Sequence, residues 1–192
     1  MKETFKAEFA KIKRPGADKL LAWLETTDFY TAPASTRYHL ARPGGLVEHS
    51  LNVYNRLTEL YIAENFEGMD ESKLESLAII GLLHDVCKAD FYTMEFRNRK
   101  NDHGSWEQYP VYTVNDKLPY GHGEKSVYII SGFMRLTREE AMAIRWHMSA
   151  FETDSSTSSY TLSAAYKQYP LAVLTHVADL MATYIDEKET ET

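Results

Sequence analysis

One segment, IIGLLHDVCKAD at residues 79–90, constrains this chain more than any other. Five apolar or small residues run directly into His84 and Asp85, and Lys88 follows one helical turn later. From Lys73 to Lys88 the pattern predicts a helix that is apolar on nearly all sides, which places it at the centre of a helical bundle. Burying an imidazole beside a carboxylate is costly, so the pair either satisfies itself with a backbone group or holds a metal ion.

Helical periodicity dominates the rest of the chain as well. The apolar positions from Leu46 to Tyr61 recur at helical spacing, and Thr137 with Glu140 has the spacing of a capping box at the start of another helix. The predicted helices cover residues 2–12, 17–26, 46–61, 73–88, 124–136, 137–147, 162–168 and 170–186. An irregular stretch is predicted at 31–45, and a flexible loop at 153–159, where the sequence is TDSSTSS.

Residues 91–119 differ from their surroundings. They are rich in aromatic and β-branched residues, and Asn101 to Gly104 has turn composition, which predicts a β-hairpin inserted between helices. The expected fold class is therefore all-α, a helical bundle with one small inserted hairpin. We expect residues 1–192 to form a single domain, in which 1–43 supply N-terminal helices and a loop and 44–186 the helical core.

Composition bears on the protein's compartment and on the partners it is expected to have. The formal charge of −7 argues against a broad nucleic-acid surface. No stretch approaches the roughly 18 consecutive apolar residues of a membrane span, and the first 16 residues lack the apolar core of a signal peptide. The single cysteine, Cys87, excludes an internal disulfide and fits a reducing compartment. We expect a cytoplasmic protein with no membrane partner.

Four of the seven histidines stand out by their context, together with two aspartates. His49 follows a Gly-Gly pair, His122 is framed by glycines, His147 ends a predicted helix, and Asp179 lies within the last one. With His84 and Asp85 these residues occupy five segments, so only the fold can bring them together. No single spacing among them forms a local metal motif.

Taken in order, these residues resemble the HD-domain superfamily of metal-dependent phosphohydrolases, whose pattern is H…HD…H…H…D. The segments that carry the resemblance are GGLVEHSLNV, LLHDVCK, GHGEKS, RWHM and THVADLM. The resemblance implies one or two divalent metal ions, with manganese, iron, zinc or magnesium as candidates. One ion would take His49, His84, Asp85 and Asp179. A second would take His122 and His147, with Asp85 bridging the two.

The resemblance also implies a reaction. A metal-activated hydroxide would attack phosphate mono- or diesters of nucleotides or of short nucleic-acid ends. Asp85 would be the shared catalytic ligand, and Lys88 would neutralise charge on the phosphoryl oxygens. The acidic net charge favours a small phosphorylated partner, a nucleotide, over a long polymer. Four further basic residues near the ligand segments are candidates for binding that substrate: Arg97, Arg99, Lys125 and Arg145.

The sequence departs from the family pattern at two positions. Cys87 stands where the family usually has glycine. Its interpretations are plain packing, which we favour because no partner cysteine exists, a soft metal ligand, or an oxidisable thiol. His147 is a single histidine where two-metal members often have a pair, which leaves a one-metal centre open. His176 reads as a structural histidine or as a partner of a ligand, and His39 and His103 receive no role.

Other functions share these features. A diiron oxygenase resembling myo-inositol oxygenase would use a similar ligand set, because nitrogen and oxygen donors serve iron equally well. A non-catalytic module that binds a nucleotide is the third alternative. The basic residues of the hairpin are either a lid that grips phosphate or a solvated edge that charge protects from aggregation. The sequence does not fix the oligomeric state.

Overall fold

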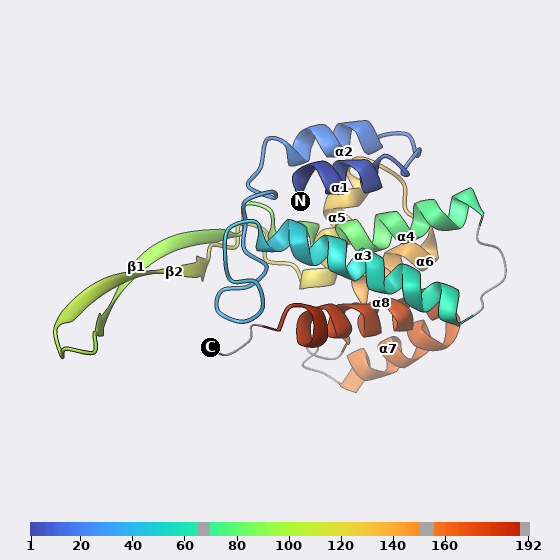
Figure 1. The fold of residues 1–192 in the computed structure, drawn as a ribbon. Helices are drawn as coiled ribbons and strands as arrows, with labels where there is room; N and C mark the ends of the chain where they lie inside the picture. The colour runs from blue at the N-terminus through green and yellow to red at the C-terminus, as the bar shows by residue number, and fades with distance from the viewer. Residues whose placement is uncertain (65–69, 150–155, 189–192) are drawn as a thin grey trace.

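The computed structural model describes residues 1–64, 70–149 and 156–188, and these form a helical bundle with one projecting hairpin (Figure 1). The elements are α1 (Lys2–Phe9), α2 (Ala17–Leu24), α3 (Gly45–Ala63), α4 (Glu71–Leu83), β1 (Tyr92–Lys100), β2 (Trp106–Val114), α5 (His122–Ser131), α6 (Arg138–Arg145), α7 (Ser156–Gln168) and α8 (Pro170–Met181). The predicted fold class is confirmed. Among the described residues, no helix combines the length and apolar content that crossing a membrane requires.

Helix α4 forms the centre of the core, as its sequence predicts. Every residue from Leu77 to Leu83 is buried, so no face of this segment meets solvent. Helix α3 packs against both α4 and α8. The approach of α3 to α4 depends on Gly81, because a Cβ at this position would lie 2.5 Å from the Cα of Tyr54. A glycine thus lets α3 and α4 lie closer together than side chains would allow.

The predicted helix 73–88 ends earlier than its pattern indicates. Helix α4 stops at Leu83, His84 is its C-cap, and Val86–Lys88 form a separate 3₁₀ turn. The break occurs at Asp85, whose φ of −108° and ψ of 18° lie outside the helical region. The amide of Lys88 then donates to the carbonyl of Asp85, which closes the tighter turn. This turn carries both Asp85 and Lys88 into the centre of the molecule.

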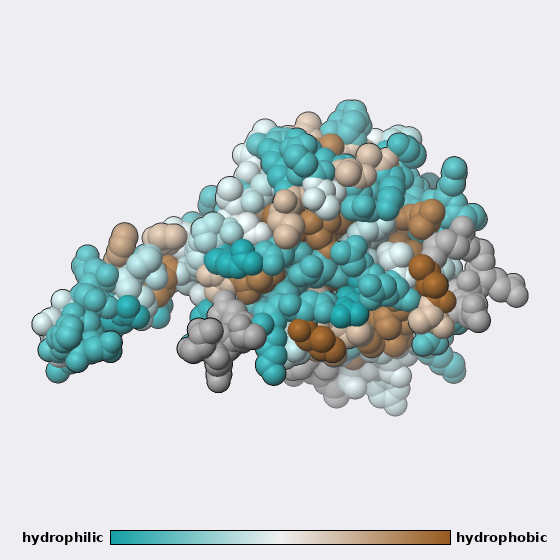
Figure 2. Space-filling view, in the orientation of Figure 1, coloured by the Kyte–Doolittle hydropathy of each residue, from teal (hydrophilic) through white to brown (hydrophobic). Residues whose placement is uncertain are grey.

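The predicted hairpin is confirmed. Strands β1 and β2 pair antiparallel from Tyr92 opposite Val114 to Lys100 opposite Trp106. The side chain of Asn101 closes the connection by accepting hydrogen bonds from backbone amides of the turn. The hairpin extends away from the helices (Figure 1), and in the view of Figure 2 hydrophilic residues cover its tip.

The C-terminal third departs from prediction at two boundaries. The helix expected over 124–136 ends at Ser131, with Gly132 as its C-cap. The Ser/Thr-rich segment 153–159 was expected to be a loop, but its residues 156–159 belong to α7, while 153–155 lie outside the described residues. Serine and threonine are common at helix starts, where their hydroxyls compete for backbone groups, so composition alone misjudged the boundary. The helix that begins at Pro170 continues beyond α8 as a π-helical turn, Ala182–Asp186.

Candidate metal centre

The fold brings together, from five segments, all six residues that the sequence resemblance assigns as ligands. Donor atoms of His49, His84 and Asp179 lie within 4.8 Å of one another, and the same holds for His84, Asp85 and His147. His122, the sixth, reaches Asp85 from the start of α5. These residues come from the first turns of α3, the end of α4, the start of α5, the end of α6 and the last turns of α8.

Two of the histidines are oriented by carbonyl groups at helix ends. Nδ1 of His84 lies 2.9 Å from the carbonyl oxygen of Gly81, and Nδ1 of His147 lies 2.7 Å from that of Ile144. A carbonyl oxygen only accepts hydrogen bonds, so each Nδ1 is the donor. In the neutral ring the other nitrogen, Nε2, therefore carries a lone pair. Burial favours the neutral ring, and it lowers the pKa of His84 to about 3.

Both Nε2 atoms face a carboxylate, which is also an acceptor. Nε2 of His84 lies 3.6 Å from Oδ2 of Asp85, and Nε2 of His147 lies 3.4 Å from Oδ1 of the same residue. Nε2 of His147 is buried and has no hydrogen-bond partner among the described residues. Acceptors that face acceptors in a buried site are stable when a cation lies among them. Imidazole and carboxylate donors suit manganese, iron or zinc, so the residues present fit a divalent metal ion.

His49 is held from the opposite side by an acid. Its Nδ1 lies 3.0 Å from Oε1 of Glu187, and its Nε2 lies 3.2 Å from Oδ1 of Asp179 and 3.3 Å from Nε2 of His84. Burial alone would lower the pKa of His49, but the two carboxylates outweigh it and raise the pKa to about 9. An ion that binds Nε2 must displace this proton, so metal uptake at neutral pH releases it.

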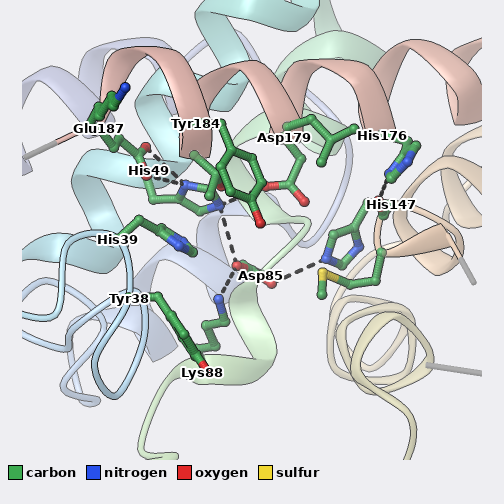
Figure 3. A pocket seen from close by; sticks show the side chains of 14 residues that line it. Tyr38, His39, His49, Asp85, Lys88, His147, His176, Asp179, Tyr184 and Glu187 are labelled. Atoms are coloured by element: carbon green, nitrogen blue, oxygen red, sulfur yellow. Dashed lines mark hydrogen bonds and ion pairs between the residues drawn. The ribbon is translucent and has the colours of Figure 1, made fainter. Parts of the chain in front are cut away.

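The sequence analysis did not identify Glu187 as a site residue. It lies one residue beyond the predicted last helix, and it reaches His49 because the π-helical turn bonds the amide of Glu187 to the carbonyl of Ala182, five residues back. Figure 3 shows Glu187 and Asp179 on either side of His49, one beside each ring nitrogen. Single π turns recur at functional sites but have no sequence signature. Only the acidic end of the sequence could have drawn attention to Glu187.

His39 was also missed, since nothing in its local sequence marks it. Its ring lies 4.9 Å from that of His49, and it lines the same cavity. Its buried Nε2 has no hydrogen-bond partner among the residues that the structure describes. Burial lowers its pKa to about 4, so the ring is neutral at pH 7. The irregular segment 31–45 thus supplies a polar group to the centre.

Asp85 lies between the two halves of the centre. Its Oδ2 lies 2.7 Å from Nζ of Lys88, and its Oδ1 lies 2.5 Å from Nε2 of His122. Burial opposes ionisation of Asp85, but the charges of Lys88 and His122 outweigh it and hold its pKa well below the ordinary value. Burial also favours the neutral form of Lys88, but the carboxylate of Asp85 outweighs burial, so the pKa of Lys88 is raised. Carboxylate and ammonium are therefore both charged at neutral pH.

A cavity of about 480 Å³ opens onto this centre (Figure 3). Asp85, Lys88 and His147 line its buried part, while Tyr38 and Tyr184 line it with side chains that are 69% and 70% exposed. Its volume is within the range of small-molecule sites.

Of the five basic residues expected to bind substrate, the structure brings only Lys88 to this cavity. Arg97 and Arg99 lie on the exposed strand β1, where Arg99 pairs with Glu107. The ammonium of Lys125 is buried against Asp116 at 2.6 Å. The guanidinium of Arg145 pairs with Glu124 and lies over the ring of Trp146, beside a separate groove between α5, α6 and α7.

His176 contacts a ligand residue through the backbone. Its Nδ1 lies 2.7 Å from the carbonyl oxygen of His147, and its ring stacks on Tyr166. This contact holds the end of α6 against α8. His103, in contrast, is exposed in the turn of the hairpin.

Comparison with known proteins agrees with this geometry. The family model described as HD domain matches residues 46–184, which is more than half of the chain. The searches of curated proteins and of solved structures found no match. The matched region begins within α3, just before His49, and ends just beyond α8, so it contains all six candidate ligands. This chain belongs to the HD-domain family, whose members are generally metal-dependent hydrolases.

Proposed function

We propose that this protein is a metal-dependent phosphohydrolase that cleaves phosphate mono- or diesters of nucleotides. One observation carries the proposal: the lone pairs of buried histidines converge with Asp85 and Asp179 beside a cavity that also contains a charged lysine. When a divalent ion is bound, it supplies Lewis acidity and lowers the pKa of a coordinated water towards neutrality.

The protein's own side chains would hold the ion and bind the substrate. Asp85 and the histidines would hold and orient the ion, and the surrounding apolar helices bury the side of the centre that faces away from the cavity. Lys88 is charged, partly faces the cavity and is fixed by Asp85, so it is placed to bind a phosphoryl oxygen and to stabilise charge that develops there. A fixed ammonium beside clustered metal ligands favours an anionic substrate.

The tyrosines of the cavity favour a nucleotide over a simple phosphate ester as the substrate. Tyr38 and Tyr184 are exposed residues that line the cavity together with Lys88 (Figure 3). Exposed aromatic faces stack on nucleobases, at about 1–3 kcal/mol per base. The net charge of −7 and a cavity of about 480 Å³ favour one nucleotide over a long polymer.

The test is turnover of bis- and mono-p-nitrophenyl phosphate, followed by a nucleotide panel, in the presence of Mn²⁺. The wild-type protein is compared with Asp85→Ala, which removes the shared ligand, and with Asp102→Ala, which removes an exposed aspartate from the hairpin turn. We expect turnover to fall to background in Asp85→Ala and to be unchanged in Asp102→Ala. A wild-type protein that carries its metal and cleaves none of these esters would contradict the proposal.

A further inference from the structure

Cys87 has polar surroundings, which its interpretation as a packing residue does not explain. The side chain is buried, yet it lies outside the main cluster of buried apolar side chains that the described residues form. Its Sγ lies 3.5 Å from Nδ1 and 3.6 Å from Nε2 of His122. Donor atoms of Cys87, His122 and Asp85 all lie within 4.8 Å of one another. The thiol therefore belongs to the polar centre and not to the core.

Both contacts with His122 are within hydrogen-bond distance for sulfur, but neither nitrogen is clearly preferred. A thiol that bonds an imidazole points at one nitrogen along its lone pair, whereas this sulfur is nearly equidistant from both nitrogens. The separation suits two ligands of one ion. Bonds of about 2.3 Å to sulfur and 2.1 Å to nitrogen, at a tetrahedral angle, put the two donors about 3.6 Å apart.

A second observation points to a cation beside the same carboxylate, that of Asp85. Nε2 of His147 is fully buried, lacks a hydrogen-bond partner among the described residues and lies 3.4 Å from Oδ1 of Asp85. Two ligands that each lie about 2.1 Å from a tetrahedral ion are about 3.4 Å apart. The same oxygen contacts Nε2 of His122 at 2.5 Å, a hydrogen bond that an ion between the two atoms would replace.

We propose that Cys87 is a metal ligand, and that its thiolate joins Asp85 and His122 in a site that prefers zinc or another borderline ion to magnesium. Thiolate sulfur is a soft donor that magnesium does not favour. Binding breaks the S–H bond and releases its proton to solvent, with no change in oxidation state. The inference concerns the centre of the proposed function and rests on that centre binding metal.

Three protein donors, with a water molecule as the fourth ligand, would complete a tetrahedral shell for this ion. Neither Cys87 nor His122 lines the cavity, whereas the candidate ligands His49, Asp85, His147 and Asp179 do. The ion held by Cys87 would therefore fix Asp85, and the cavity-facing position would remain open to substrate.

The experiment titrates metal-free protein with Co²⁺, without substrate, and records the near-ultraviolet spectrum. Because Cys87 is the only cysteine, a thiolate-to-cobalt charge-transfer band reports on this residue alone. We expect the band in the wild type, its loss in Cys87→Ser, and its retention in His103→Ala, which removes an exposed histidine. Zinc affinity should fall at least about tenfold in Cys87→Ser, as loss of even an outer partner costs 10–100-fold.

X-ray absorption at the zinc edge of the wild-type protein gives a readout that needs no variant. We expect one sulfur scatterer at about 2.3 Å. Cobalt that binds without the band, or a zinc shell of nitrogen and oxygen alone, would overturn the role of Cys87 while leaving the proposed hydrolase intact. Failure to bind either metal would overturn both.

Discussion

His84 and His147 enter the centre by the same route, each from the end of a helix. Each donates its Nδ1 hydrogen to the carbonyl three residues earlier, Gly81 for one and Ile144 for the other. Carbonyls in the last turn of a helix lack intrahelical partners, so these rings satisfy them and are oriented at the same time. His49 instead uses Glu187, a charged acceptor that strengthens its basicity towards a metal.

Glu187 is therefore expected to govern metal affinity without contacting the ion. We predict that Glu187→Ala weakens Mn²⁺ or Zn²⁺ binding by about 10–100-fold, measured by isothermal titration calorimetry. The matched control is Asp186→Asn, because Asp186 is the neighbouring acid but pairs with Arg56 at the surface. Equal affinities in the two variants would show that Glu187 is not a partner of the ligand His49.

Lys88 should act on the reaction more than on the metal. We predict that Lys88→Ala lowers kcat by about 10²–10³-fold, the usual effect of losing one group that stabilises transition-state charge. Metal content, measured by inductively coupled plasma spectrometry, should match the wild type, and Lys19→Ala, on the exposed face of α2, should have normal kcat. Loss of metal in Lys88→Ala would identify the lysine as a structural partner of Asp85.

The residues that sequence reasoning selected are those with a distinctive local context. His84 and Asp85 interrupt an apolar helix, and His122 lies between glycines. His39 and Glu187 lack such context, since one lies in an irregular segment and the other depends on a π-helical turn. The basic residues were chosen by proximity along the chain, and the structure places Lys125 and Arg145 against their own acidic partners.

At the scale of elements, two glycine contacts set the separation of the ligand-bearing helices. Gly81 lets α4 approach Tyr54 on α3. Gly123 does the same for α5 and α6, because a Cβ there would lie 2.3 Å from the carbonyl oxygen of Arg145. His84 follows Gly81 by three residues and His122 precedes Gly123, so each close approach lies within one turn of a candidate ligand.

Substitution at the first of these contacts should loosen both the core and the centre. We predict that Gly81→Ala lowers the free energy of unfolding by about 1–3 kcal/mol, the usual cost of overpacking, and also weakens metal binding. Urea denaturation of the metal-free protein measures the first effect. The control is Gly132→Ala, where the added Cβ meets only carbonyls of its own helix. A stability loss no larger than that of the control would contradict this account.

The elements themselves were largely predictable because their patterns are local. The capping box of Thr137 and Glu140 is present as predicted, and the hairpin follows from its aromatic and β-branched residues around a polar turn. Helix ends were harder to locate. The apolar pattern continues through Val86 and Cys87, so nothing in it reveals that the chain leaves the helix at Asp85, where backbone torsion changes to serve the centre.

At the scale of the whole molecule, one buried ion pair ties the N-terminal segment to the bundle. The guanidinium of Arg14 donates to both carboxylate oxygens of Glu140, at 2.6 and 3.0 Å, and it also contacts Glu75 on α4. Glu140 accepts a further bond from Ser76 and closes its own capping box. Three segments therefore meet at one carboxylate whose side chain is 1% exposed.

This pair makes stability depend on pH in a defined direction. Burial would raise the pKa of Glu140, but hydrogen bonds from Arg14, Ser76 and Thr137 outweigh it and lower the pKa. A carboxyl group with a lowered native pKa stabilises the fold above its unfolded value of about 4.3, and this contribution is lost as the pH falls through the native pKa.

We predict that Glu140→Gln lowers the free energy of unfolding at pH 7 by about 2 kcal/mol, because it weakens a charge-assisted pair. The difference from wild type should shrink below about pH 4. Urea denaturation from pH 3 to 7 measures both. Glu139→Gln, which alters a partly exposed pair with Lys73, should change stability by no more than about 1 kcal/mol. A difference that is independent of pH would contradict the assignment.

The hairpin meets the bundle at a single point, because Tyr92 and Val114 are the first and last residues of one strand ladder and lie opposite each other. The path of the chain through the helices therefore does not depend on how long the arm is or what its tip carries. Loop tips accept insertions most readily, and this tip extends away from the helices. The turn at residues 101–104 is therefore a suitable attachment point. A fluorophore, an affinity tag or a second protein inserted there would lie far from the candidate metal ligands.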